Sequence, residues 1–429
     1  MKCVYCNTEK DLTVSDIIPY ALTGAKVQKR FVCRTHNGFT NDHYEKQVNA
    51  NFAVYRNLLD LAERDGDPVR FFADLNIGGH TVKAVISDRE SIFGKGRMFS
   101  ITDENGKKTL VGDLERIRKM RRFDPKKLKE VDLADISYHV NDSMERLFIS
   151  SEVLHTVAKT AYEWHCYSNK IEQYHEEKYH EIVSYILTPE SPYCPVEIVA
   201  ESPLWTIMDY QCRVGTNMLF EYTDSDGNLY VIFGFWGVIL YKVRICRSDR
   251  QPEPDADIYT IHLYHVDGTE ETAPTGMMSL TGVFPSIYSV PPAQGLPRYC
   301  NAIKDRLSKI TMRSLSKEYL KKQVDKIKKI LPAYEIGKTD YKKVLAFGDD
   351  DRFFAVYVLE LLYCNRDNYE KSETFDQNIK RILQEDEVFT LTAKIKNEAL
   401  ARYVDMDRNG TLLGMLQESI DFFDSITGT

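Results

Sequence analysis

The spacing of apolar residues predicts helices in three parts of the chain. Over residues 150–188, apolar positions recur every three to four residues, which indicates two amphipathic helices that end before Pro189. A shorter stretch with the same spacing, residues 46–64, predicts a helix that packs on the next part of the chain. After about residue 296 the pattern is helical to the end of the chain.

Two other parts alternate apolar and polar residues with a period of two, which is typical of strands. Residues 69–112 contain turn signals at Gly78-Gly79 and at 104–106, and they predict hairpins. From Pro195 to about Tyr288 the pattern predicts a sheet, with a hairpin turn at 224–227.

These patterns together predict an α+β protein with four successive parts. Residues 1–50 are predicted to form a small N-terminal unit, and residues 51–195 an α+β region that contains the helical pair. Residues 196–295 are predicted to form a β-rich region with a mixed or antiparallel sheet, and residues 296–429 a helical C-terminal region.

Composition narrows the class of protein without naming a function. The chain has 429 residues, and its 43% hydrophobic and 28% charged residues are typical of a globular protein. No run of 18 apolar residues occurs, so no membrane span or membrane partner is expected. Nine cysteines, an odd number, fit a reducing compartment, and the residues before Cys3 do not read as a basic and then hydrophobic leader, so secretion is not expected. A cytoplasmic location is therefore expected.

Four metal-binding side chains lie close to the N-terminus. Cys3 and Cys6 form a Cys-x-x-Cys pair, and Cys33 and His36 form a Cys-x-x-His pair. Each pair can occupy one turn while the intervening chain folds back, and thiolate and imidazole ligands in two close pairs are typical of tetrahedral Zn²⁺. The spacing therefore predicts a structural zinc site.

The residues between and after these pairs resemble the zinc-bearing HNH endonucleases. Residues 12–19 read Leu-Thr-Val-Ser-Asp-Ile-Ile-Pro, and residues 33–45 continue from Cys33 through Asn37 to Glu45. The family pattern places Asp/Glu-His-Ile-Ile-Pro between two zinc-binding pairs, the second of which opens a helix. The resemblance covers about the first tenth of the chain. It implies a ββα unit that holds one divalent ion, Mg²⁺ or Mn²⁺, against a phosphodiester of nucleic acid, with DNA favoured.

Carried onto this chain, the family's metal-binding acid falls on Ser15, its general-base histidine on Asp16, and its metal-binding residue at the head of the helix on Asn37. An aspartate is a far weaker base than imidazole at neutral pH. Three alternatives stay open. In the first, Asp16 is the metal-binding carboxylate and the base comes from elsewhere, with His43 the nearest imidazole. In the second, Asp16 is itself the base. In the third, the unit is inactive and holds nucleic acid or a protein.

Several polar residues after Asn37 have a simpler interpretation. Asn41, Asp42 and His43 are residue types that begin helices, and Glu45 is favoured in a first helical turn. As individual residues they fit helix capping better than catalysis, whereas as a group near the HNH-like motif they are candidates for mutation.

Two basic runs stand out against a net charge of −8. The second extends from Lys304 to Lys329, and both can neutralise phosphates, although such runs are often solvated helix faces. The first supplies the candidate nucleic-acid-binding residues Arg116, Arg118, Lys119, Arg121 and Arg122.

Two functions are compatible with these observations as hypotheses. The first is a divalent-metal-dependent endonuclease with structural zinc, and by analogy with other HNH-type units it could be a phage-defence effector that forms homo-oligomers. The second is an inactive zinc-binding interaction module derived from the same unit.

Overall fold

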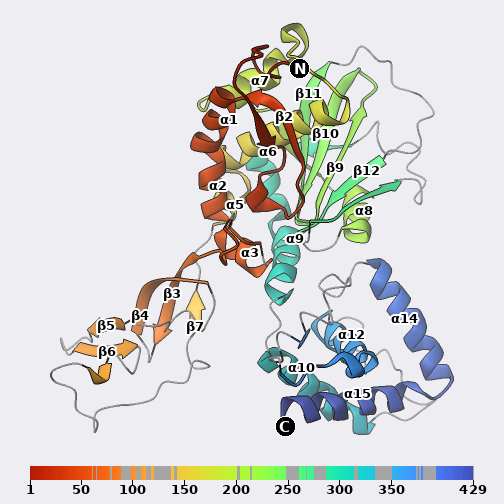
Figure 1. Ribbon diagram of the computed structural model, residues 1–429. Coiled ribbons are helices and arrows are strands. Elements are labelled where there is room, and N and C mark those ends of the chain that lie inside the picture. Colours follow the sequence, from red (N-terminus) through yellow and green to blue (C-terminus); the bar gives the residue numbers. More distant parts are fainter. Residues whose placement is uncertain are drawn as a thin grey trace.

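The computed structural model describes residues 1–428 except for 60, 64, 78–79, 88–97, 103–107, 113–116, 120–136, 140–142, 201–202, 213–214, 248–259, 267, 275–286, 314–316, 334–349, 373–374, 376–377 and 380–392. Helices and strands are both abundant in these residues, which confirms the predicted α+β class. Figure 1 shows the large sheet beside the N-terminal helices, with a small strand region and a helical C-terminal region below.

The N-terminal segment forms an antiparallel hairpin followed by a long helix. The hairpin consists of β1 (Leu12–Asp16) and β2 (Gln28–Cys33), with the 3-10 turn η1 (Tyr20–Leu22) between them. The helix consists of α1 (Arg34–Thr40), the π-helical turn η2 (Asn41–Glu45) and α2 (Lys46–Asn51), and α3 (Ala53–Leu58) follows. The stretch predicted as a helix over 46–64 is helical as α2 and α3, but α3 ends at Leu58, and Ala62 forms an isolated β-bridge with Pro68.

The prediction that Asn41 to His43 begin a helix is wrong. The chain is helical from Arg34 onward, and Thr40 and Asn41 both have right-handed helical backbone angles. The short polar residues that suggested a cap lie inside the helix, where they form a π-helical turn. Such turns occur frequently at functional sites, so the polar residues of η2 need a different explanation.

The largest sheet among the described residues has seven antiparallel strands, in the order β13-β12-β9-β10-β11-β8-β14. The turn between β9 and β10 lies where it was predicted, and Gly227 has a φ of 80° there. The strands are β8 (Val196–Val199), β9 (Asn217–Thr223), β10 (Asn228–Phe235), β11 (Ile239–Arg247), β12 (Thr260–Tyr264), β13 (Glu270–Pro274) and β14 (Ser289–Val290).

The region predicted as sheet also contains a helix that the period-two pattern did not indicate. Residues Pro203–Gln211 form α8. Leu204, Ile207 and Met208 are buried there at the i, i+3, i+4 spacing of one helix face.

The helix α6 (Ser151–Ser168) lies between the N-terminal helix and the sheet. It contacts η2 and α2 on one side and β10 and β11 on the other (Figure 1). It follows α5 (Met144–Phe148) and precedes α7 (Glu176–Leu187), so the two helices predicted before Pro189 are confirmed. Because both faces of α6 are covered, the polar residues in its middle, such as His155, Lys159 and Glu163, are buried.

The N-terminal segment and the sheet share one hydrophobic core, which includes Phe31, Phe52, Trp164 and Trp236. The indole N–H of Trp236 donates a 2.7 Å hydrogen bond to the carbonyl oxygen of Leu22. The N-terminal segment therefore folds against the sheet.

The N-terminal segment approaches the chain that follows β12 closely at Gly24. A Cβ added there would lie 2.1 Å from the carbonyl oxygen of Val266. We expect Gly24→Ala to lower the free energy of unfolding by about 1–3 kcal/mol, as overpacking of a closely packed contact does. Urea denaturation measures this, with Gly414→Ala as the control, because an added Cβ at Gly414 meets nothing within 4 Å. Equal stability of the two variants would contradict the close approach.

A smaller strand region has its own core around Phe71, Leu75 and Ile86. The predicted turns at Gly78-Gly79 and 104–106 lie outside the described residues, although the strands that flank them pair as hairpins. The strands are β3 (Phe71–Ile77), β4 (His80–Ile86), β5 (Met98–Thr102), β6 (Lys108–Gly112) and β7 (Ser137–His139).

The described residues of the C-terminal part are mainly helical, as predicted, and a second hydrophobic core is built from α10, α12, α14 and α15. None of the described helices has the length and apolar character needed to cross a bilayer. The elements are α9 (Pro292–Arg313), α10 (Lys317–Ile330), η8 (Leu331–Ala333), α12 (Asp350–Cys364), η9 (Arg366–Asn368), α14 (Ala393–Arg408) and α15 (Leu412–Thr427).

Candidate metal centre and adjoining cavity

The four predicted zinc ligands lie together. Cys3 and Cys6 sit on a turn in which the backbone N–H of Asn7 donates to the Cys3 carbonyl oxygen, and Asn7 has a φ of 61°. Cys33 ends β2, and His36 lies in the first turn of α1. The ligand atoms of all four residues lie within 4.8 Å of one another.

The separations of these atoms fit tetrahedral zinc. Cys33 Sγ is 3.2 Å from His36 Nδ1, Cys3 Sγ is 3.6 Å from the same nitrogen, and Cys6 Sγ is 4.0 Å from Cys33 Sγ. A tetrahedron with Zn–S bonds of about 2.3 Å and a Zn–N bond of about 2.0 Å has edges of about 3.5–3.8 Å. The group can therefore bind one zinc ion through Nδ1 of His36 and three sulfur atoms.

Burial shifts the pKa of the histidine and of the buried cysteine in opposite directions. It lowers the pKa of His36, which favours the neutral imidazole that binds metal. It raises the pKa of the Cys3 thiol to about 12, so this thiol keeps its proton until a cation replaces it. Zinc binding is thus expected to release protons.

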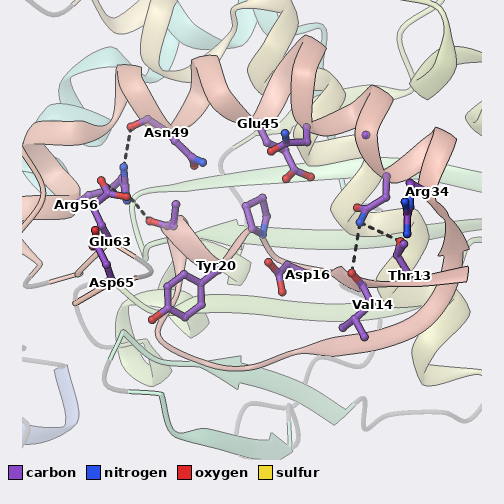
Figure 2. A pocket seen from close by; sticks show the side chains of 15 residues that line it. Thr13, Val14, Asp16, Tyr20, Arg34, Glu45, Asn49, Arg56, Glu63 and Asp65 are labelled. Carbon is purple, nitrogen blue, oxygen red and sulfur yellow. Dashed lines mark hydrogen bonds and ion pairs between the residues drawn. The ribbon is translucent and has the colours of Figure 1, made fainter. Parts of the chain in front are cut away.

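A cavity of about 740 Å³ lies between the hairpin and the helix (Figure 2), and its lining includes Arg34 and Asn37, the sequence neighbours of Cys33 and His36. Asp16 reaches it from the end of β1, and Asn37 reaches it from α1. The remaining lining residues are Thr13, Val14, Pro19, Tyr20, Ala21, Arg34, Gly38, Asn41, Glu45, Asn49, Arg56, Glu63 and Asp65.

The helix faces the cavity with a row of polar residues spaced by four. Asn37, Asn41, Glu45 and Asn49 all line it. Residues four apart lie above one another on a helix, so their spacing in the sequence was the signal that could have revealed this face. In Figure 2, Glu45 points from the helix toward the strand that carries Asp16.

Hydrogen bonds orient the two candidate catalytic residues. The amide nitrogen of Asn37 donates to Thr13 Oγ1 at 3.2 Å and to the Val14 carbonyl oxygen at 3.4 Å, which leaves its amide oxygen as the atom suited to a cation. The amide of Gln28 donates to Asp16 Oδ1 at 2.5 Å across the hairpin. Thus β1 positions both residues at the same cavity.

Ser15, the position of the family's metal-binding acid, lies on the other side of β1. Its side chain is fully buried, and its hydroxyl donates to Glu163 Oε2 at 2.8 Å. Successive side chains of a strand point to opposite faces, so Ser15 faces the interior while Val14 and Asp16 line the cavity.

His43 is exposed and is not among the residues that line the cavity. Its ring stacks on Phe39 at a centroid distance of 4.1 Å, and its Nδ1 lies 2.9 Å from the Phe39 carbonyl oxygen. No histidine occurs among the described residues that line the cavity. The assignment of His43 as the base stays a prediction.

The far end of the cavity is built around Arg56, a buried residue of α3. Its guanidinium donates to the carbonyl oxygens of Ala21 and Asn49 and to Glu63. The amide oxygen of Asn49 is buried without a hydrogen-bond partner, so a ligand with an N–H or O–H group could satisfy it.

A buried ionic cluster lies between the hairpin and α6. Lys159 Nζ is 2.5 Å from the Asp16 carbonyl oxygen, 2.9 Å from Glu45 Oε1 and 3.6 Å from Glu163 Oε2. Burial lowers the pKa of Lys159, but Glu163 and Glu45 outweigh this and raise it overall, so Lys159 is charged. Burial raises the pKa of Glu163, although the charge of Lys159 and the hydrogen bonds from Ser15 and Tyr5 oppose this.

The predicted nucleic-acid-binding run is only partly described. Arg118 and Lys119 are exposed. In the second run, Lys321 and Lys322 are exposed on α10. Arg116, Arg121 and Arg122 lie outside the described residues.

Comparison with protein-family models, with curated proteins and with solved structures finds no match for this chain.

Proposed function

We propose that the protein is a zinc-stapled, divalent-metal-dependent endonuclease of the HNH type, acting on nucleic acid with DNA favoured. The main support is the meeting of Asp16 and Asn37 at one cavity, from the two elements that the resemblance assigns to them. A carboxylate and an amide oxygen are ligands suited to Mg²⁺ or Mn²⁺.

The charge of the cavity supports a requirement for a cation. Four carboxylates and two guanidinium groups line it, so a phosphate entering alone would meet net negative charge. A divalent ion bound there would polarise the phosphoryl oxygens and stabilise the leaving oxygen. Asp16 and Asn37 would hold that ion, Arg34 would pair with a flanking phosphate, and Asn49 would accept a hydrogen bond from the substrate.

The experiment is cleavage of supercoiled plasmid and of single-stranded RNA by zinc-loaded protein, with and without added Mg²⁺ or Mn²⁺. Nicked or linear plasmid only when the metal is added is the expected result. Omission of metal is preferable to chelation, since a chelator also removes zinc. Cleavage of RNA alone would correct the expected substrate, and metal-independent cleavage would refute the mechanism.

A second candidate function is an inactive nucleic-acid or protein interaction module. It is favoured by the absence of histidine from the described cavity lining, because imidazole is the usual base at neutral pH. Binding of plasmid or RNA in gel-shift assays without cleavage under any metal would support it.

His43→Ala tests the remaining candidate base. Because the His43 ring lies outside the cavity, we expect the variant to cleave within about threefold of the wild-type rate, far from the 10²–10⁴-fold loss typical of a missing general base. Initial cleavage rates at saturating Mg²⁺ measure this. A loss as large as that of an Asp16 variant would identify His43 as the base.

A further inference from the structure

The two walls of the cavity come from different elements, and one buried side chain touches both. Lys159 is 1% exposed in the middle of α6. Its ammonium contacts the backbone of β1 at Asp16 and forms an ion pair with Glu45 of η2. Neither contact is local. Asp16 is 143 residues away in the sequence, and Glu45 belongs to the N-terminal helix.

The ammonium group suits this position. It carries three N–H donors and no acceptor, and here it meets one carbonyl oxygen and two carboxylates. Glu163, one of the two carboxylate partners of the ammonium, is fully buried and accepts hydrogen bonds from Ser15 and Tyr5. Glu45, the other carboxylate partner, lines the cavity.

The same cluster reaches the zinc-binding group. Tyr5 lies between Cys3 and Cys6, its ring is 5.4 Å from that of His36, and its hydroxyl donates to Glu163 Oε1 at 2.9 Å. Side chains from the zinc-binding turn, β1, η2 and α6 therefore meet at one buried point.

We propose that Lys159 is a positioning residue that fixes the end of β1 and the Glu45 side chain relative to each other, and thereby sets the geometry in which Asp16 and Glu45 face the cavity. The expected effect of Lys159 on cleavage rests on the proposed nuclease function. Its expected effect on the positions of the two cavity walls does not depend on that function.

The first test is hydrogen exchange of the zinc-loaded full chain, comparing wild type with Lys159→Met. We expect amides in peptides covering residues 12–18 and 41–48 to exchange about tenfold faster, because both walls lose the contact that holds them. Peptides from β10 and β11 are expected to keep their exchange rates. Lys46→Met is the matched control, because Lys46 pairs with Asp42 on the exposed side of the N-terminal helix that carries Glu45.

Unchanged exchange in both wall peptides would overturn the proposal, as would an equal acceleration across the whole chain, which indicates a general structural role. If Lys159→Met does not fold, Glu45→Gln replaces it, since it weakens the ion pair and leaves Lys159 in place. Faster exchange in 41–48 without change in β10 and β11 is then expected, and unchanged exchange in 41–48 would overturn the proposal.

The second test uses cleavage. At full zinc content, Lys159→Met is expected to raise the Mg²⁺ concentration for half-maximal cleavage about tenfold, because displaced ligands bind the ion less well. A lower maximal rate with an unchanged Mg²⁺ requirement would count against positioning of the cavity. If the wild type cleaves nothing, the proposed function fails, and hydrogen exchange alone decides the role of Lys159.

Discussion

Replacing Cys33 with serine is expected to remove zinc from the protein and to unfold its N-terminal segment. The Cys33 side chain is 5% exposed and belongs to the same hydrophobic core as Phe31 and Val32. Its backbone N–H also donates to Cys3 Sγ at 3.3 Å. A zinc ion bound by this group would join the first turn to the start of α1, so loss of the metal would remove that link.

The expected loss of stability is at least about 4 kcal/mol, which is the stabilisation from a ligand present at a thousand times its Kd. Structural zinc binding is coupled to folding, so metal content and unfolding should change together. Elemental analysis and urea denaturation measure the two quantities. Cys364→Ser is the control, because Cys364 is an exposed thiol outside the zinc-binding group. A Cys33→Ser protein that keeps one zinc per chain would overturn the ligand assignment.

The second large effect is expected at Asp16. Asp16→Ala should lower metal-dependent cleavage by about 100-fold or more, because it removes a carboxylate proposed to hold the divalent ion. Stability should change little, because the contact between Asp16 and Lys159 uses the backbone carbonyl oxygen, which alanine keeps. Initial rates at saturating Mg²⁺, with zinc content and unfolding measured in parallel, test this.

Asp42→Ala is the matched control for Asp16→Ala. Asp42 is an exposed carboxylate on the same N-terminal unit, paired with Lys46 and absent from the cavity lining. It should cleave at nearly the wild-type rate. Equal rates for the Asp16 and Asp42 variants would remove Asp16 from the mechanism.

Asp16→His separates the alternatives that the sequence leaves open for this residue. If Asp16 stands at the base position, the histidine variant should cleave at least as fast as wild type at neutral pH, since imidazole is the better base there. If Asp16 is the carboxylate that holds Mg²⁺, the variant should lose cleavage, because Mg²⁺ prefers oxygen ligands. The same rate assay distinguishes the two outcomes.

The zinc-binding group could be predicted from the sequence because its determinants are local. Cys3 and Cys6 share one turn, and Cys33 and His36 span the start of one helix, so each pair is brought together by a few residues of backbone. Only the closure of β1 on β2 was then needed to join the pairs. Periodicity likewise predicted α6 and α7, whose apolar stripes are long and regular.

The cavity could be predicted only in part. Asp16 and Asn37 were identified through the resemblance. Asn41 was interpreted as a helix cap, since short polar side chains favour caps, and Glu45 as an acid favoured in a first helical turn. The structure instead extends one helix from Arg34 through both residues, so they face the cavity with Asn37. The beginning of a helix depends on the backbone before it, and here β2 leads directly into α1.

The sequence by itself therefore determined the candidate zinc-binding group, the α+β class and the helices α6 and α7, since these depend on spacing along a short stretch of chain. Only the tertiary structure decided the role of α6. His155, Lys159 and Glu163 are spaced by four, and such a polar row ordinarily faces solvent. Here the N-terminal segment covers it, and a charge removed from water must meet partners that lie far away in the sequence, such as Glu45 and the Asp16 carbonyl oxygen.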